Sequence, residues 1–292
     1  MTGTGPDWAN DIDFDELRAM VPDLEIGDPL GSGGFAVVFR AWDPELERWV
    51  AIKVLRVRNE IGRQAFRAEA RAQAKLDLHP HIVRIHRSKA GDKYCLIVME
   101  YMAGGTLEKR ADLAGPEACA CALALAYALQ HAHSHGVLHR DVKTSNALID
   151  AKGRIALADL GIAKVRNGLI TRASREIGTT ECMAPEQFDA GGELGDFTDV
   201  YGLGGILLEL FGGSMALTQR LLKTPPVPLD VPTPVADVIR RALHPRHSER
   251  FQTAESFAVA LDHACRAAYG DDWLARSGIR VWRESAGGRD AD

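Results

Sequence analysis

The segment His139–Asn146 contains side chains whose chemistry belongs together: a carboxylate at Asp141, an amine at Lys143 and an amide at Asn146. Further along the chain, Asp159 supplies a second carboxylate. One carboxylate can orient a hydroxyl group, and the other can join the amide oxygen in holding Mg²⁺, which prefers oxygen ligands. Two carboxylates, an amide and an amine gathered in loops therefore indicate phosphoryl transfer.

Two features nearer the N-terminus could bind phosphate. The glycine-rich stretch 31–34 lies between two predicted strands, where backbone N–H groups can approach a phosphate without a Cβ in the way. A dinucleotide-binding turn would lead into a helix, and a Walker loop would contain Gly-Lys-Ser/Thr; neither is found here. Strand alternation puts Ala51 and Lys53 on one face and Ile52 on the other. Lys53 is then either an edge lysine in solvent or a cation held over a phosphate.

The elements that would position these residues follow from local patterns. Short runs rich in β-branched and aromatic residues predict strands at 24–31, 36–42, 49–55, 82–87 and 93–101. Helical composition and boundary signals predict helices at 60–78, 116–135 and 198–211, with a small hairpin at 146–159. A β-rich part therefore precedes a helical part, with the joint near residues 100–105, and a cleft between two such lobes is a natural ligand site.

Composition narrows the class of protein. The chain has 292 residues, 46% of them apolar and 26% charged, which predicts a globular protein rather than a disordered one. A net charge of −5 argues against nucleic acid as a partner. Five cysteines without CxxC spacing favour free thiols in a reducing compartment. The acidic N-terminal stretch and the lack of an apolar span of about 20 residues predict a cytoplasmic protein without a membrane partner.

The motifs occur in the order in which protein kinases have them, and the chain resembles the eukaryotic-like serine/threonine kinases of bacteria over residues 24–266. The segments that resemble the glycine-rich loop, lysine strand, catalytic loop, metal-binding loop and A-P-E box are GSGGFAVVF at 31–39, VAIK at 50–53, HRDVKTSN at 139–146, DLG at 159–161 and MAPE at 183–186. Asp199 resembles the aspartate that anchors the catalytic loop. Arg250 resembles the arginine that pairs with the box glutamate, here Glu186.

The resemblance implies an α+β fold: a bilobal protein-kinase-like fold with a small antiparallel β-rich N-lobe and a larger helical C-lobe. It implies an acidic N-terminal arm at 1–23, the N-lobe at 24–100, the C-lobe at 101–266 and a C-terminal tail at 267–292. The implied activity is transfer of the ATP γ-phosphoryl group to Ser/Thr hydroxyls of protein substrates, with ATP and Mg²⁺ as cofactors.

Residue roles also follow from the resemblance. The implied catalytic residues are Asp141, Lys143, Lys53 and Asp159, with Asn146 and Asp159 holding Mg²⁺. The residues implied to bind the nucleotide are Gly31, Gly33, Val38, Ala51, Lys53, Glu69, Met99, Glu100, Met102, Asn146 and Asp159. Within this set, Val38 and Ala51 would sandwich the adenine, Met99 is the gatekeeper, and Glu69 would pair with Lys53.

Regulation through the activation loop is a further expectation. Arg140 resembles the arginine that receives a phosphate from that loop, and Thr171 and Ser174 are the candidate sites, each beside an arginine. The alternative is an unmodified flexible loop. Dimerisation for trans-autophosphorylation and a cognate phosphatase are the partners that such regulation implies.

Alternatives to an active protein kinase are a pseudokinase scaffold and a kinase of small molecules. The presence of the charged and amide residues of the motifs argues against the scaffold, and the A-P-E box argues against the small-molecule kinase.

The N-terminal arm is either solvated or a docking or inhibitory segment, and the C-terminal tail either packs on the helical lobe or binds a partner. Cys182 is a candidate redox switch. The period-two spacing of His131, His133 and His135 favours capping and packing over metal binding.

Overall fold

The computed structural model describes residues 9–32, 36–57, 59–76, 79–110, 113, 115–160, 182–189, 191–215 and 227–283. These residues form two compact units, each with a core of its own. Among the described residues, the first unit takes in those up to 76 and 83–103, and the second takes in 79–82, 104–160 and those from 182 onward. A β-rich part and a helical part, as the sequence predicts, are both present.

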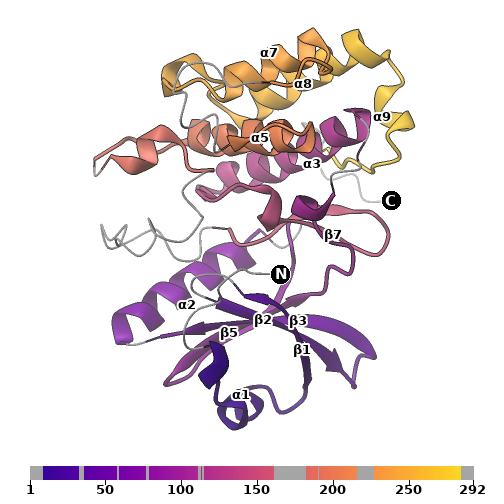
Figure 1. Cartoon of the computed structure of the whole chain (residues 1–292). Helices are drawn as coiled ribbons and strands as arrows, with labels where there is room; N and C mark the ends of the chain where they lie inside the picture. The colour runs from indigo at the N-terminus through magenta and orange to yellow at the C-terminus, as the bar shows by residue number, and fades with distance from the viewer. Residues whose placement is uncertain are drawn as a thin grey trace. The chain divides into compact units, whose positions relative to one another are not determined.

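The first unit is built on a five-stranded antiparallel sheet in the order β1-β2-β3-β5-β4. Its strands are β1 (Glu25–Ser32), β2 (Ala36–Asp43), β3 (Arg48–Arg56), β4 (Ile85–Ala90) and β5 (Tyr94–Glu100). The helix α2 (Glu60–Ala74) contacts β4 and β5 (Figure 1). All five predicted strands and the helix between them are confirmed.

The short helix α1 (Phe14–Met20) packs on this sheet, and the solvated-arm interpretation is wrong for these residues. Asp13 caps the helix, because its side chain accepts a hydrogen bond from the Glu16 N–H. Leu17 is only 1% exposed and belongs to the same apolar cluster as Val50, Ile52 and Val54 of β3. Of the acidic residues that suggested an arm, Asp15 is exposed, whereas Asp13 and Glu16 are half-buried, so burial of the apolar side chains sets the fold.

The second unit is mainly helical and is arranged around α3 (Gly115–Ser134). The predicted start near Pro116 and stop at Gly136 are confirmed, and Gly136 has the positive φ of 73° that favours glycine after a helix. The other α-helices are α5 (Asp196–Leu210), α7 (Thr233–Ala242), α8 (Ala254–Tyr269) and α9 (Trp273–Arg276). Figure 1 shows α7 and α8 stacked beyond α5 and α3.

A small sheet and several 3-10 helices carry the loops of this unit. The sheet pairs β6 (Gly105–Thr106), β7 (Ala147–Ile149) and β8 (Ile155–Leu157) in that order. The 3-10 helices are η2 (Leu107–Lys109), η3 (Thr144–Asn146), η4 (Pro185–Phe188) and η5 (His247–Glu249); a further one, η1 (Ala9–Asp11), precedes α1 in the first unit. The predicted hairpin is therefore present as β7 and β8, and it joins the motif loop at 139–146 to the one that begins at Asp159.

The described part of the C-terminal tail packs on the helical unit, which settles one of the two expectations for it. Trp273 is fully buried beside α3 and α8, and its Nε1 donates to Asp262 Oδ1 at 3.0 Å. Further along, the Trp282 N–H donates to Nε2 of His81 at 2.8 Å. Residues up to 283 are therefore part of the folded unit.

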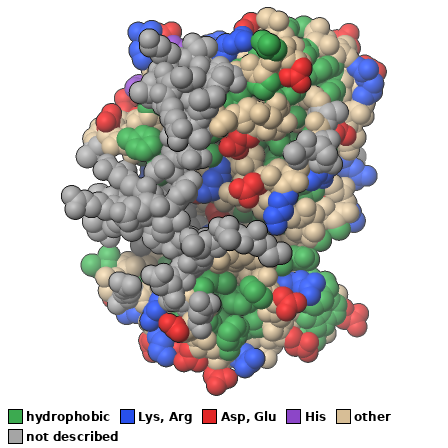
Figure 2. All heavy atoms as spheres, in the orientation of Figure 1, with side chains coloured by type: hydrophobic (Ala, Val, Ile, Leu, Met, Phe, Trp, Pro, Cys, Tyr) green, Lys and Arg blue, Asp and Glu red, His purple; other side chains and the backbone are tan. Residues whose placement is uncertain are grey.

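The described surface is mixed in charge. On the face drawn in Figure 2, acidic and basic side chains are interspersed among apolar and neutral ones. Among the residues that the structure describes, no helix is long and apolar enough to cross a membrane.

Candidate active site

In the first unit, the predicted nucleotide-binding residues of the sheet share one face. Val38 lies directly opposite Lys53 in the β2–β3 register, and Ala51 lies opposite Met99 in the β3–β5 register. Residues paired directly across antiparallel strands point to the same side, and alternate residues of one strand do so too. Val38, Ala51, Lys53 and Met99 therefore lie on the face opposite to the one that α1 covers, as the alternation around Ile52 predicts.

The residues after β5 are held by a local exchange of hydrogen bonds. The Glu100 N–H donates to the Arg84 carbonyl at 3.0 Å, and the Arg84 N–H donates to Oε1 of Glu100 at 2.8 Å. Met99 and Met102 are both buried. The Glu100 N–H is therefore already bonded within the protein.

The structure describes some of the remaining predicted site residues only by their backbone, and others not at all. Gly31 lies in β1 and Glu69 lies in α2, although the side chain of Glu69 lies outside the described atoms. Gly33, Thr171 and Ser174 lie outside the described residues.

In the second unit, two of the predicted site residues, Lys143 and Asn146, contact Asp141. Its Oδ2 is 3.1 Å from Lys143 Nζ and accepts a hydrogen bond of 3.2 Å from Asn146 Nδ2. The same amide nitrogen donates to the Asp141 carbonyl at 2.8 Å. The turn η3 brings this about, because it folds Asn146 back over the residues before it. The Asp141 carboxylate is therefore oriented by two donors from its own loop.

A buried carboxylate on α5 fixes the start of this loop. Asp199 Oδ2 accepts from the His139 N–H at 2.8 Å, and Oδ1 accepts from the Arg140 N–H at 2.6 Å. His133 of α3 contacts the same carboxylate through Nε2 at 2.8 Å. The anchoring role that the sequence predicts for Asp199 is confirmed.

His139 connects the loop to the segment of Asp159. Its Nδ1 accepts from the Asp141 N–H at 3.2 Å, so Nε2 carries the hydrogen that bonds the Ala158 carbonyl at 2.8 Å. The Ala158 N–H in turn donates to the Asn146 carbonyl at 2.8 Å. Asp159 follows with a φ of 63°, a left-handed conformation that non-glycine residues adopt only when their surroundings hold it. The two loops are thus bound into one framework.

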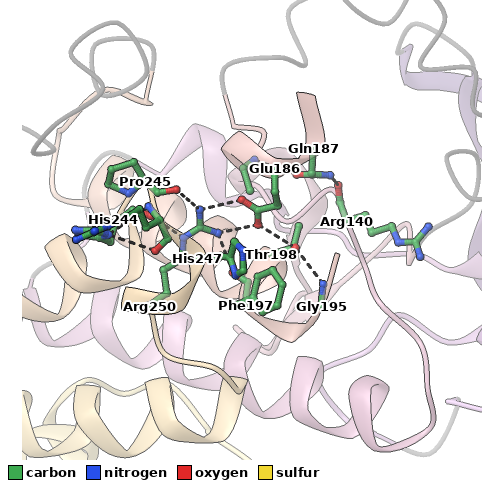
Figure 3. A network of polar contacts seen from close by, with 12 residues as sticks. Arg140, Glu186, Gln187, Gly195, Phe197, Thr198, His244, Pro245, His247 and Arg250 are labelled. Carbon is green, nitrogen blue, oxygen red and sulfur yellow. Dashed lines mark hydrogen bonds and ion pairs between the residues drawn. The ribbon is translucent and has the colours of Figure 1, made fainter. Parts of the chain in front are cut away.

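The ion pair predicted between Glu186 and Arg250 is present and buried (Figure 3). Arg250 donates from Nη1 and Nη2 to the two carboxylate oxygens at 2.8 and 2.9 Å, and Thr198 Oγ1 donates to Oε1 at 3.0 Å. Such a two-point pair fixes geometry as well as charge. It holds η4 on the helical unit.

Three contacts near Asp141 were missed by the sequence analysis. The Gln187 side chain bonds the Arg140 carbonyl, and Glu209 of α5 accepts hydrogen bonds from Thr144 and Cys182. Each contact joins segments far apart in the chain, and no local spacing marks them. They could be found only from the folded structure.

Oxygen ligands suitable for a magnesium ion are present in this unit. Because Asn146 Nδ2 is bonded to Asp141, the Oδ1 atom on the other branch of the amide points away from these bonds. An amide oxygen and a carboxylate such as that of Asp159 are the donors that Mg²⁺ prefers. The described residues hold no cluster of three or more His, Cys, Asp or Glu side chains for a metal, so such an ion would take its remaining ligands from elsewhere.

Comparison with known proteins agrees with this arrangement. The model of the protein kinase domain matches residues 24–259. The chain is 36% identical over 257 residues to the serine/threonine-protein kinase PrkC of Bacillus subtilis, covering 80% of this chain and 39% of that protein. It is 34% identical over 265 residues to PknB of Mycolicibacterium smegmatis, covering 81% of this chain and 42% of the other. With PknF of Mycobacterium tuberculosis the identity is 36% over 262 residues, and the covered shares are 80% and 54%.

The chain thus spans between 39% and 54% of the length of these curated relatives. Because the family model covers most of the chain and carries the motifs whose contacts are described above, the chain belongs to the protein kinase family.

Proposed function

We propose that the chain is an ATP- and Mg²⁺-dependent protein serine/threonine kinase that transfers the γ-phosphoryl group of ATP to protein hydroxyls. The observation that carries this proposal is the Asp141 carboxylate, which Lys143 and Asn146 hold at 3.1 and 3.2 Å in a loop pinned to Asp199. A carboxylate fixed in this way can accept a hydrogen bond from a substrate hydroxyl and orient it for attack. Lys143 would neutralise charge on the phosphoryl group in transit.

The nucleotide would be held by the sheet face that carries Lys53. Val38, Ala51 and Met99 offer apolar surface to the adenine, and Lys53 offers a cation to the α- and β-phosphates. The Glu100 carbonyl and the Met102 backbone would meet the adenine edge, and Glu69 would pair with Lys53. Gly33 would cover the phosphates together with Gly31.

Gly31 supports this role for the glycine-rich turn. Among the residues that the structure describes, a Cβ built on Gly31 meets no atom within 4 Å, so packing in the described part of the protein does not require glycine there. A ligand that approaches the backbone closely does require it. Mg²⁺ would be bound by Asn146 and Asp159, where it would neutralise phosphate charge and orient the triphosphate.

Regulation by phosphorylation is part of the proposal. Nε of Arg140 is buried and has no hydrogen-bond partner among the described residues, so a phosphate on the activation loop would satisfy it. Thr171 and Ser174 are the proposed sites. Trans-autophosphorylation in a dimer and removal of the phosphate by a phosphatase are the interactions that this regulation would use.

The test is transfer of radiolabelled phosphate from ATP, with Mg²⁺, to a generic protein substrate by the full chain. We expect Asp141→Asn to lower turnover by about 10²-fold to 10⁴-fold, because an amide cannot take the hydroxyl proton. The matched control is Asp237→Asn, which changes an exposed carboxylate paired with Arg240 at 2.7 Å and should leave turnover unchanged. Phosphopeptide mapping of the same samples should find phosphate at Thr171 or Ser174 in the wild type and none in Asp141→Asn.

The outcomes separate the alternatives. Equal turnover by the wild type and Asp141→Asn would defeat the assignment of Asp141. Thermal stabilisation by ATP without turnover on any protein would instead indicate a pseudokinase scaffold. Turnover that requires a small hydroxylated compound would indicate a small-molecule kinase.

A further inference from the structure

The backbone that leads into Asp141 is held in a strained conformation. Arg140 has a φ of 64°, in the left-handed region that a bulky residue adopts only when its surroundings impose it. On the upstream side, Asp199 accepts the N–H groups of His139 and Arg140 at 2.8 and 2.6 Å. These two bonds fix the peptide group before Arg140. They do not hold the peptide group between Arg140 and Asp141, whose N–H donates to Nδ1 of His139 at 3.2 Å and whose carbonyl needs a partner of its own.

Gln187 supplies the partner for the carbonyl of this peptide group. Its Nε2 donates to the Arg140 carbonyl at 2.9 Å, and this carbonyl belongs to the peptide group that begins Asp141. Its Oε1 accepts from the Ala184 N–H at 3.0 Å. The Gln187 amide therefore bridges two segments that are far apart in the chain. Its nitrogen can only donate and its oxygen can only accept, and the bridge uses each atom in that role.

The side chain of Gln187 starts from a rigid base. It is the third residue of η4, and its bond to Ala184 closes the first turn of that helix in the manner of a capping box. The preceding residue, Glu186, is locked to Arg250 by the buried ion pair. Figure 3 shows Gln187 extending from Glu186 toward the Arg140 backbone, while the Arg140 guanidinium points away from it.

We propose that Gln187 is a positioning residue for phosphoryl transfer: its amide holds the Arg140–Asp141 peptide group and thereby sets the direction of the Asp141 carboxylate. This inference rests on the proposed role of Asp141. Asp199 holds the backbone before the strained residue, and after it His139 holds the N–H and Gln187 the carbonyl of the Arg140–Asp141 peptide group. Loss of the Gln187 bond leaves this peptide group held at its N–H alone, so it can tilt, and small misplacements of a reacting group cost large factors in rate.

Two substitutions separate the two ends of the bridge. Gln187→Glu keeps an oxygen that accepts from Ala184 but replaces the donor by a second oxygen, which repels the Arg140 carbonyl. Gln187→Met is similar in size and loses both contacts. We expect Gln187→Glu to lower kcat about tenfold to a hundredfold at pH 8, with KM for ATP and the melting temperature close to the wild-type values.

Lower pH should restore the donor. A protonated carboxyl group has an O–H that can donate to the Arg140 carbonyl, so the ratio of kcat for Gln187→Glu to that of the wild type should rise as the pH falls from 8 toward 5.5. The charged groups of the segments that Gln187 joins are Arg140, Asp141 and Glu186, with Asp199 and Arg250 behind them. These groups are common to both proteins, so the ratio removes their own titration. Gln187→Met should show the loss of kcat without the pH-dependent recovery.

The matched control is Gln252→Glu. Gln252 Nε2 also donates to backbone carbonyls of the Arg250 network, at 2.9 Å to His247 and 3.0 Å to Arg250, but it does not reach the catalytic loop. Its kcat should equal that of the wild type. The proposal fails if Gln187→Glu has wild-type kcat at every pH, or if its loss is independent of pH and matched by Gln252→Glu. Asp141→Asn is measured beside them: activity in that variant would instead remove the proposed function.

Discussion

Cys182 lies beside the catalytic loop, in a polar setting that suppresses its reactivity. Its Sγ donates to Oε1 of Glu209 at 3.8 Å, and Thr144 Oγ1 donates to Oε2 of the same carboxylate at 2.9 Å. Burial, and next the negative charge of Glu209, raise the pKa of Cys182 to about 12. The thiolate is the reactive form of cysteine. These contacts therefore argue against the redox switch considered from the sequence.

We expect Cys182 to be alkylated slowly by iodoacetamide at pH 8, because its thiolate fraction is about a thousandfold below that of an unperturbed thiol. Peptide mapping by mass spectrometry gives the rate for this cysteine separately from the other four. The variant Glu209→Gln removes the neighbouring charge and should speed the labelling. Labelling of the wild type at the rate of a free cysteine would contradict the raised pKa.

The side chains of the site differ in how far the sequence predicts them. The contacts of Asp199 and Arg250 are found as expected, because each residue stands in a motif whose partners the family resemblance names. Gln187 has no such signal, since its bond to Arg140 depends on two turns meeting in space. Backbone strain at Arg140 and Asp159 is likewise a property of the folded loops and not of their residue types.

At the scale of single elements, α1 shows how an acidic segment can hide an apolar surface. Leu17, Met20, Val21 and Leu24 are all buried, and their spacing of three, four and seven residues is the pattern typical of an apolar helix face, although the helix itself ends at Met20. The signal was therefore present in the sequence, but the surrounding acidic residues suggested a solvated arm. Lys93 on the sheet side contacts Asp13 and Glu16 at 3.1 Å each, so the acidic residues also help to hold the helix in place.

We expect Leu17→Ala to destabilise the sheet unit by about 2–5 kcal/mol, because it leaves a cavity between α1 and β3. The control Asp15→Ala removes an exposed ion pair with Arg18 and should cost less than about 1 kcal/mol. Hydrogen exchange measured by mass spectrometry reports the two units separately. Peptides from β2 and β3 should lose protection in Leu17→Ala, while those from α3 keep it. Unchanged protection in β3 would show that α1 does not stabilise the sheet.

At the scale of the whole molecule, the two units differ in their buried histidines. His79 and His81 lie in the helical unit, are 3% and 1% exposed, and stack near His131 of α3. Burial lowers the pKa of His79 to about 3, with smaller contributions from the neighbouring histidines. Burial also lowers the pKa of His81, although its bond to the Ile155 carbonyl partly opposes this. Among the described histidines, only His86 belongs to the sheet unit.

These shifts predict that acid destabilises the helical unit. An unfolded histidine binds a proton near pH 6.5, whereas folded His79 stays neutral to a much lower pH, so the unfolded state binds more protons and stability falls as the pH drops below 6.5. Protonation is further opposed because Nδ1 of His79 accepts from the His81 N–H at 3.2 Å. By pH 5.5 the loss from His79 alone should be about 1 kcal/mol.

Urea unfolding followed by far-UV circular dichroism, which reports chiefly the helices, measures this loss between pH 7.5 and 5.5. In that window unfolded carboxylates stay ionised, so the change belongs to the histidines. The variant His79→Asn keeps an acceptor for the His81 N–H but cannot take up a proton, and we expect its stability to vary less with pH than that of the wild type. His263→Asn, at an exposed position on α8, is the matched control and should keep the wild-type dependence. Equal pH dependence in all three proteins would mean that His79 is protonated as readily in the folded state as in the unfolded chain.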